Sequence, residues 1–311
     1  MSLEIINSGA QALVTDLGRP GHRHRGVPLS GAADRLSHQI ANHILGNPLP
    51  AATIECALGG LSIRALENVT LTLCGADITP EVDGKSVPMW SAVTLRAGQT
   101  LSTSRPALGA RTYLAVAGGI DGTSHFGSRA TYPPARLGAN AGRALAPGDT
   151  LQVGSLTGTP NPLPAAFRPR LSNHVTLRAR SVSEWDRLSG EAQRRLFTRP
   201  WTASAQTSRM GARLDGDPLP LADARPMISG PLPLGTLQVT PSGQPILGLI
   251  DGHCTGGYAR AIQVIAADVW LMGQIVPGTR ISFNRCFADD APAILDAHMA
   301  LWGSVMEGYR V

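Results

Sequence analysis

Short runs of apolar and β-branched residues recur along the chain, and they constrain the fold more than any other feature. Examples are Leu71–Cys74 (LTLC), Thr112–Ala117 (TYLAVA), Val175–Arg178 (VTLR) and Ile246–Ile250 (ILGLI). Glycine, proline, aspartate or asparagine lies near most of their ends, as expected for strands joined by turns. We therefore expect a mainly β protein, built as barrels or sandwiches with few helices.

The length of 311 residues favours two domains rather than one. The proline-rich stretch Gly158–Arg170 (GTPNPLPAAFRPR) has no helix or strand periodicity, which makes it the best linker candidate. We predict that two β-rich halves meet near residues 155–175. The predicted boundaries are a first domain over 1–160, a second over 171–290 and a C-terminal helical tail over 291–311.

Composition and charge exclude several classes of function. Charged residues make up 16% of the chain, against about 25% in typical soluble domains, so we expect a partner to cover part of the surface. The arginines are scattered without a basic stripe, which argues against nucleic acid. No apolar run approaches about 18 residues and the first residues, MSLEIINSG, lack a signal-peptide pattern, so we expect no membrane segment. Four cysteines without C-x-x-C spacing indicate a reduced, cytoplasmic protein.

The loop Asp16–Asp34 (DLGRPGHRHRGVPLSGAAD) is dense in glycine, proline and serine and leads into a predicted helix, Ala32–Leu45. Ser30 is the expected N-cap of that helix. Glycine and proline each impose particular backbone shapes, so such a loop is specified residue by residue. It either binds a ligand or is an elaborate turn that only connects two elements.

Two further loops in the second half combine glycine with polar residues, Ser204–Leu214 (SAQTSRMGARL) and Gly243–Tyr258 (GQPILGLIDGHCTGGY). The apolar run ILGLI delivers Asp251 to a strand end, and the TGGY segment lets the backbone approach a ligand or another strand. This arrangement can build an amide-binding site, and it can equally build a bulge. Further polar side chains come from Gln206, Arg209 and Gln244.

Several catalytic motifs are absent. The chain has no G-x-x-x-x-G-K-[ST] loop and no G-x-S-x-G elbow, and Lys85 is its one lysine, in a turn context that argues against Schiff-base chemistry. His22 and His24 could ligate a metal, but the interleaved arginines would repel a cation, so we expect no metal. His253 could share proton transfer with Asp251.

With these motifs in order along the chain, the sequence resembles the allophanate hydrolase subunit 2 family. This family is also called the biotin-dependent carboxyltransferase or kinase-inhibitor-antagonist family, and it includes the C subunit of 5-oxoprolinase. The resemblance runs from about residue 3 to about residue 283. The matching residues include Asp16, Gly18, Arg19, Gly21, Gly26, Pro28, Ser30, Gly31, Asp34, Leu73–Asp77, Tyr113–Ile120, Gly127–Tyr132, Pro147–Asp149, Arg209–Gly211, Gly243, Asp251 and Thr255–Tyr258. The sequence departs from the family pattern at Thr15, Ser208, His253, Cys254 and Ala259, positions that bear on the substrate more than on the fold.

The resemblance implies two cyclophilin-like β-barrel domains with flanking helices. It implies a small amide substrate and an allophanate hydrolase subunit 1-type partner. The first functional expectation is ATP-dependent hydrolysis of 5-oxoproline (pyroglutamate) with that partner and a lactam-hydrolase subunit, with ATP bound through the complex. One alternative is a carboxyltransferase component that uses carboxybiotin from another domain to carboxylate urea or a similar amide. The other alternative is a regulatory protein that binds and antagonises a kinase-inhibitor-type partner.

We expect the loops of both halves to converge on one cleft between the domains, where ligand sites concentrate. Arg19 and Arg209 would hold a carboxylate or phosphate, and Asp251 would orient the amide or accept a proton. The rival interpretation is that ion pairs within the loops, such as Asp16–Arg19 and Asp251–Arg260, only hold loop shape. The predicted catalytic residues are Asp251, Arg209 and Gln244, and the predicted substrate-binding residues are Asp16, Arg19, Ser30, Asp34, Gln206, Thr255, Gly256, Gly257 and Tyr258, with Gly256 and Gly257 offering backbone donors.

Overall fold

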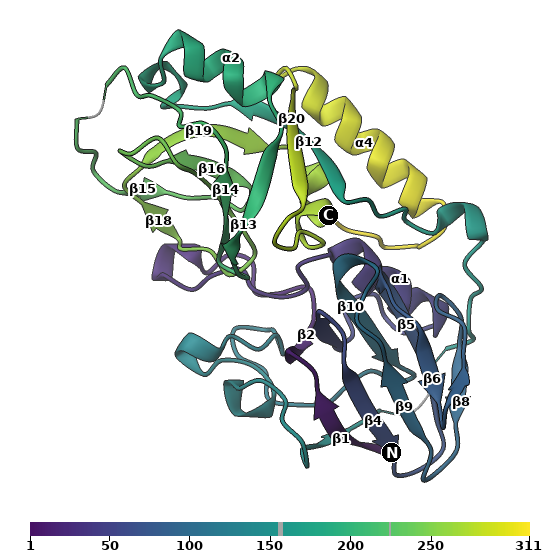
Figure 1. Ribbon diagram of the computed structural model, residues 1–311. Helices are drawn as coiled ribbons and strands as arrows, with labels where there is room; N and C mark the ends of the chain where they lie inside the picture. The colour runs from purple at the N-terminus through teal and green to yellow at the C-terminus, as the bar shows by residue number, and fades with distance from the viewer. Residues whose placement is uncertain (155–157, 224) are drawn as a thin grey trace. The chain divides into compact units, whose positions relative to one another are not determined.

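The computed structural model describes residues 1–154, 158–223 and 225–311, and these residues form two compact units (Figure 1). The first unit contains Met1–Arg19, Ser30–Leu171 and Trp302–Arg310. The second contains Pro20–Leu29, Ser172–Leu301 and Val311. The predicted linker, Gly158–Arg170, therefore belongs to the first unit, and part of the predicted meeting region, residues 155–157, lies outside the described residues.

Two antiparallel sheets form most of the first unit. The six-stranded sheet runs in the order β11 (Thr150–Gln152), β1 (Ser2–Ser8), β4 (Leu61–Ala65), β9 (Thr100–Thr103), β6 (Pro80–Val82) and β7 (Lys85–Ser86). The five-stranded sheet runs in the order β2 (Gln11–Thr15), β3 (Thr53–Ala57), β10 (Leu108–Val116), β5 (Val69–Asp77) and β8 (Val93–Leu95).

Apolar side chains from both sheets share one core in the first unit. In β4 the alternation of a strand directs Leu61, Ile63 and Ala65 inward and leaves Arg64 exposed. Ile54 in β3, from the other sheet, belongs to the same core cluster. The Asp16–Asp34 loop follows directly after β2, whose last residue is Thr15.

One helix, α1 (Arg35–Ile44), flanks the five-stranded sheet. Its N-cap is Asp34, whose carboxylate accepts from the backbone N–H of Ser37, and not Ser30 as the sequence indicated. Asp34 is better placed because its side chain lies one residue before the first helical turn and reaches the free N–H groups there. Gly46, with a left-handed φ of 68°, follows the last turn and ends the helix.

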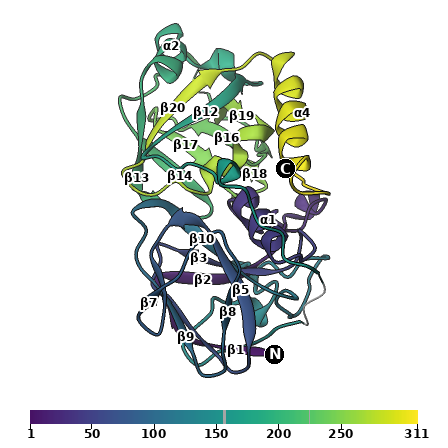
Figure 2. The ribbon, with the colours of Figure 1, turned by 90° about the vertical axis from the view of Figure 1, so that its right-hand side faces the viewer.

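The second unit is built around a closed seven-stranded barrel (Figure 2). Its neighbouring strands are antiparallel except β12 and β20, which pair in parallel. The order around the barrel is β12 (His174–Ser181), β19 (Ala259–Val264), β16 (Thr236–Val239), β17 (Pro245–Gly248), β14 (Gly211–Asp215), β13 (Trp201–Thr207) and β20 (Arg280–Arg285). A separate two-stranded ladder joins β15 (Gly230–Pro231) to β18 (Thr255–Gly256).

The barrel of the second unit encloses an apolar core that includes Trp201, Leu237 and Phe283. Helices flank it, and the long C-terminal helix packs Ile294 and Leu295 against Ile265 on the barrel side. The α-helices beyond α1 in the described residues are α2 (Gly190–Thr198), α3 (Val269–Met272) and α4 (Asp290–Gly303). The 3-10 helices in the described part of both units are η1 (Arg23–Arg25), η2 (Pro133–Ala135), η3 (Asn140–Gly142), η4 (Ala165–Phe167), η5 (Trp185–Arg187) and η6 (Ala266–Asp268).

The segment Pro20–Leu29 leaves the first unit and joins the second. Arg23 in η1 fixes it there, because its Nη2 atom donates to the carbonyl oxygens of Leu232, at 2.5 Å, and His253, at 2.9 Å. The tail is divided in a similar way, since Trp302–Arg310 returns to the first unit.

The prediction of a mainly β fold with few helices is confirmed. Among the described residues, no helix is long and apolar enough to cross a membrane.

Candidate functional site

Asp16 shapes the start of the first loop. It is 8% exposed, and its carboxylate accepts three hydrogen bonds. The donors are the backbone N–H of Gly18 at 2.8 Å, the hydroxyl of Ser128 at 2.6 Å and the backbone N–H of Arg129 at 2.6 Å. The carboxylate thus ties the end of β2 to a segment more than a hundred residues later.

Arg19 is fully buried in the same loop. Its guanidinium donates from Nη2 to the carbonyl oxygen of Ala130 and from Nε to that of His125, at 3.5 Å. Charged donors bonded to backbone carbonyls hold a loop firmly in place. Arg19 and Asp16 therefore both brace the first loop against residues 125–130.

Ser30 and Asp34 lie where the loop enters α1, and both are fully buried. Ser30 adopts a φ of 52°, a left-handed conformation that is uncommon for residues other than glycine. Gly31 follows with φ of 86°, and a Cβ on it would lie 2.6 Å from the backbone nitrogen of Gly18. Only glycine therefore fits the close crossing of the two ends of this loop.

Three buried hydroxyls at the end of β2 have no hydrogen-bond partner in the described part of the chain, those of Thr15, Ser30 and Thr131. Backbone bonds place their segments beside one another, because Thr131 N–H donates to Val14 and Ala32 N–H donates to Asp16. A buried hydroxyl left unpaired costs about 1–3 kcal/mol. The site therefore favours a bound water or a polar ligand group, and Thr131 adds to the predicted residues.

A buried polar network of Glu55, Arg111 and Tyr113 contacts the end of the first loop. The sequence analysis assigned these three residues no functional role. The hydroxyl of Tyr113 donates to Glu55 Oε2 at 2.9 Å, and Glu55 Oε2 accepts from Ala33 N–H at 3.0 Å. Arg111 Nε lies 3.2 Å from Glu55 Oε1. Burial, with the nearby carboxylates, raises the pKa of Tyr113 well above its ordinary value, so its hydroxyl stays protonated and keeps donating.

In the second unit, Arg209 and Asp251 form a buried ion pair. Arg209 Nε lies 2.7 Å from Asp251 Oδ2, and Nη2 lies 3.3 Å from Oδ1. The two residues are 8% and 5% exposed, and Asp251 N–H also donates to the carbonyl of Arg209. The structure thus brings together two of the three predicted catalytic residues, while Arg260 pairs with Glu184 and not with Asp251.

Gln206 and Gln244 form hydrogen bonds with residues other than Arg209 and Asp251. Gln206 is exposed near the end of β13. Gln244 is half-buried, and its Oε1 atom accepts from Arg213 Nη1 at 2.9 Å. Its backbone N–H donates to the hydroxyl of Thr240. These contacts stabilise the turn between β16 and β17.

The TGGY segment lies along the two-stranded ladder and the start of β19. Thr255 is exposed, and Tyr258 is 45% exposed. A Cβ on Gly256 would lie 2.5 Å from Gln238 Nε2, so a larger residue here would displace the Gln238 side chain. The Nε2 atom of Gln238 donates to the carbonyl of Tyr258, at 3.3 Å, which fixes the far side of the segment. Convergence of these residues with the first loop on one cleft stays a prediction.

Comparison with known proteins agrees with this fold and these motifs. The family model for the carboxyltransferase domain, subdomains A and B, matches residues 25–285. The chain therefore belongs to the carboxyltransferase domain A and B family. Two similar proteins are C subunits of 5-oxoprolinase. The one from Escherichia coli K12 is 35% identical, with 93% of each chain covered, and the one from Haemophilus influenzae is 32% identical, with the same coverage.

Other relatives contain this region as a part of a longer chain. A putative urea carboxylase of Emericella nidulans is 32% identical over 93% of this chain and 24% of its own length. The crystal structure of Kluyveromyces lactis urea carboxylase superimposes with a TM-score of 0.93 at 25% identity, covering all of this chain and 30% of that one.

Proposed function

We propose that this chain is a subunit of a small-amide-processing enzyme that hydrolyses 5-oxoproline to glutamate, coupled to ATP hydrolysis. The observation that carries the proposal is the similarity to two 5-oxoprolinase C subunits along 93% of each chain. The activity would need an allophanate hydrolase subunit 1-type partner and a lactam-hydrolase subunit, with ATP bound through the complex. Because both relatives are named as one subunit of an enzyme, their names support assembly with other subunits.

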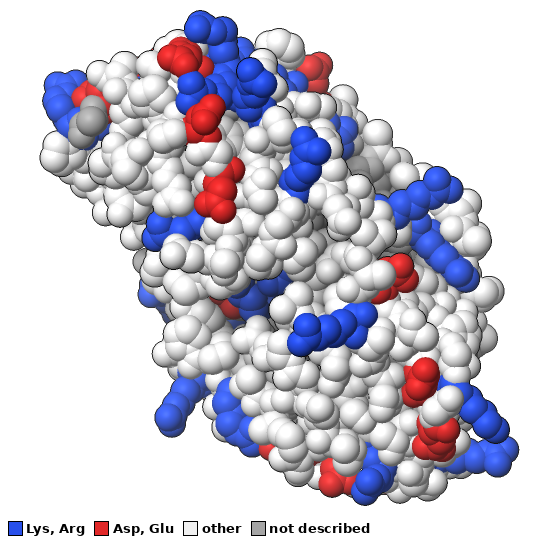
Figure 3. All heavy atoms as spheres, viewed as in Figure 1, with Lys and Arg blue, Asp and Glu red and all other residues white. Residues whose placement is uncertain are grey.

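The surface supports a protein that works in a complex. Charged residues make up only 16% of the chain. On the face in Figure 3 they form small groups of both signs, separated by wide uncharged areas. A surface with so few charges is less costly to cover with a partner, because fewer charged groups lose their hydration.

Two buried thiols, those of Cys56 and Cys74, are poor candidates for a nucleophile. Burial raises the pKa of Cys56 to about 11 and raises that of Cys74 well above its ordinary value. Both thiols therefore stay protonated at neutral pH, while the thiolate is the nucleophilic form. In this proposal Asp251 orients the amide or accepts a proton, Arg209 holds the Asp251 carboxylate in position, and the Gly256–Gly257 backbone donates to the developing oxyanion.

The test is turnover of 5-oxoproline with ATP by the chain reconstituted with both partner subunits. Asp251→Asn keeps the size of the side chain but removes its negative charge, and we expect turnover to be lost. Asp268→Asn is the matched control, because Asp268 is also buried in the second unit and is ion-paired with Arg178. Equal turnover per folded complex in the two variants would show that Asp251 has a structural role and no role in turnover.

A carboxyltransferase component is the second candidate, favoured by the family match and by the likeness to urea carboxylase. In this case carboxybiotin, presented by another domain, would donate its carboxyl group to urea or a similar amide. The discriminating measurement is carboxylation of urea by the chain supplied with its carrier and biotin carboxylase. Carboxylation without 5-oxoproline turnover would replace the first proposal with this one.

A further inference from the structure

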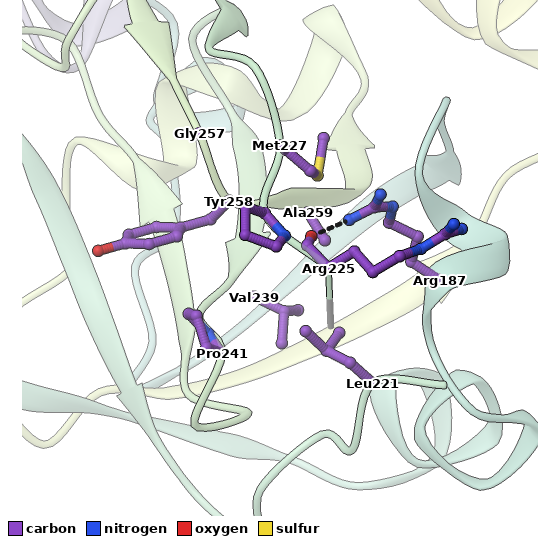
Figure 4. Close-up of a pocket in the computed structure, with 10 residues that line it drawn as sticks. Arg187, Leu221, Arg225, Met227, Val239, Pro241, Gly257, Tyr258 and Ala259 are labelled. Carbon is purple, nitrogen blue, oxygen red and sulfur yellow. Dashed lines mark hydrogen bonds between the residues drawn. The ribbon is translucent and has the colours of Figure 1, made fainter. Parts of the chain in front are cut away.

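A cavity of about 270 Å³ opens in the second unit, between residues 221 and 225–227 on one side and the barrel end on the other (Figure 4). Its volume lies near the lower end of the range for small-molecule sites, about 300–1,000 Å³. Two predicted site residues, Gly257 and Tyr258, lie in its wall, whereas Arg209 and Asp251 do not. The remaining wall residues are Arg187, Leu221, Arg225, Pro226, Met227, Val239, Pro241 and Ala259.

Arg187 makes contacts with several described residues beside this cavity. Its carbonyl oxygen accepts from Ala222 N–H at 2.8 Å, and its Nη1 atom donates to the carbonyl of Arg225 at 2.8 Å. Leu188 forms a β-bridge with Leu221. Leu221, Ala222 and Arg225 are thus each held by a separate contact to residues 187–188.

The charges at the cavity do not balance. Asp223 pairs with both arginines, with Oδ2 3.3 Å from Arg187 Nη2 and Oδ1 2.8 Å from Arg225 Nε. One carboxylate therefore faces two guanidinium groups, which leaves one positive charge. Arg225 is 82% exposed at its side chain, so part of its guanidinium faces solvent and can contact a ligand.

The rest of the wall is largely apolar. Figure 4 shows Leu221, Val239 and Met227 around the cavity, with both arginines on one side and the Tyr258 ring directed away from them. An apolar wall with one positive end suits a ligand that has an apolar body and one negative charge. The planar guanidinium matches a carboxylate in shape and hydrogen-bonding pattern.

We propose that this cavity binds a small carboxylate with an apolar body, whose carboxylate pairs with Arg187 and Arg225. The excess of one positive charge matches a monoanion rather than a phosphate dianion. 5-Oxoproline shares the size and the single carboxylate of this class, although its five-membered ring also carries a polar amide, and its assignment to the cavity rests on the proposed function. The cavity would then be a recognition site for the lactam carboxylate in this subunit, at a place that the Arg209–Asp251 pair does not line.

The test measures binding to the full chain alone by ligand-observed NMR. The probes are cyclopentanecarboxylate, 5-oxoproline, the neutral cyclopentanecarboxamide and inorganic phosphate. We expect both carboxylates to bind at least about fivefold more tightly than the amide or phosphate, because each forms a charge-assisted contact. An amide or phosphate that binds as tightly as the carboxylates would overturn the proposal.

Variants locate the bound probe. Arg225→Gln should weaken cyclopentanecarboxylate binding about fivefold without unfolding the chain, because the side chain is mostly exposed. Arg225→Lys should retain part of the affinity. The control is Arg199→Gln, an exposed arginine directly after α2 and outside the cavity, which should bind like the parent chain. Unchanged binding by Arg225→Gln would overturn the assignment.

The outcomes separate this proposal from the proposed function. Cyclopentanecarboxylate binding without 5-oxoproline binding would support the carboxylate site and overturn its assignment to the lactam. Binding of both probes, without turnover in the reconstituted complex, would support the cavity and count against the enzymatic proposal alone.

Discussion

The backbone N–H of Asp34 donates to the hydroxyl of Tyr113 across 2.7 Å, where both residues are fully buried. The same hydroxyl donates to Glu55. The Tyr113 side chain therefore links the five-stranded sheet to Asp34, the N-cap of α1. The end of the first loop that enters α1 is thereby anchored to the core of the first unit.

Tyr113→Phe should destabilise the chain by about 1–3 kcal/mol, because it leaves buried polar groups without a partner. The free energy of unfolding, measured by urea denaturation, checks this. Thr94→Ala is a suitable control, since it removes a hydroxyl that hydrogen-bonds Thr70 at an exposed position. A loss for Tyr113→Phe no larger than that for Thr94→Ala would contradict the role assigned to the network.

The two helix caps should respond differently to alanine. Asp34→Ala removes a buried acceptor for both the N–H and the hydroxyl of Ser37, so we expect a loss of about 1 kcal/mol or more. Ser189→Ala, at the cap of α2, removes one acceptor with a longer contact to Ala192, 3.2 Å, and should cost less. Thermal unfolding of both variants tests the order, and the reverse order would argue against capping as the main role of Asp34.

Breaking the Arg209–Asp251 pair from one side should be costly. Arg209→Met leaves a buried carboxylate unpaired, and we expect a loss of about 3 kcal/mol or more. Adding Asp251→Asn to that variant should recover part of the loss, because the uncompensated charge is removed. A double-mutant cycle in denaturant measures this coupling, and additive effects would show that the two side chains act independently.

His38 should make stability depend on pH. Burial, with the charge of Arg35, lowers the pKa of His38 from 6.5 to about 3, so the folded chain keeps it neutral. The unfolded chain takes up a proton below pH 6.5 and the folded chain does not. Stability from this group is therefore complete above that pH and falls as the pH drops toward 3, by up to about 1.4 kcal/mol per pH unit.

Urea denaturation of His38→Gln from about pH 4.5 to pH 8 checks that slope. The variant should show a weaker loss of stability toward low pH than the parent chain. His24→Gln, at an exposed position, should retain the parent dependence. A parallel shift of the His38→Gln curve at all pH values would mean that the buried imidazole does not set the slope.

Much of the fold follows from local patterns. Alternating runs such as Val175–Arg178 predict strands because period-2 burial is encoded within a few residues. The helix before Gly46 was also predictable, but its start was placed too early. The helix begins at Arg35, so Asp34 lies directly before it and reaches the N–H of Ser37, whereas Ser30 lies further back in a loop whose shape the local pattern does not reveal.

The candidate site was only partly predictable for a related reason. The density of glycine and polar residues marked Arg209 and Asp251, and their pairing is a tertiary fact that joins positions 42 residues apart. Glu55 and Tyr113 carry no local signal, since each looks like an ordinary strand residue until the sheet buries it. The Arg187–Arg225 cavity depends likewise on where a loop without periodicity folds back.

Each unit takes in a piece of chain from beyond the midpoint: Pro20–Leu29 belongs to the second unit, and Trp302–Arg310 belongs to the first. Cutting the chain at its midpoint would therefore not give two self-sufficient halves. A fragment ending near Leu171 would lack the returning tail, and the remaining fragment would lack the stretch of chain held by Arg23. Such fragments should behave as a complementation pair, each gaining its full structure only when the other is supplied.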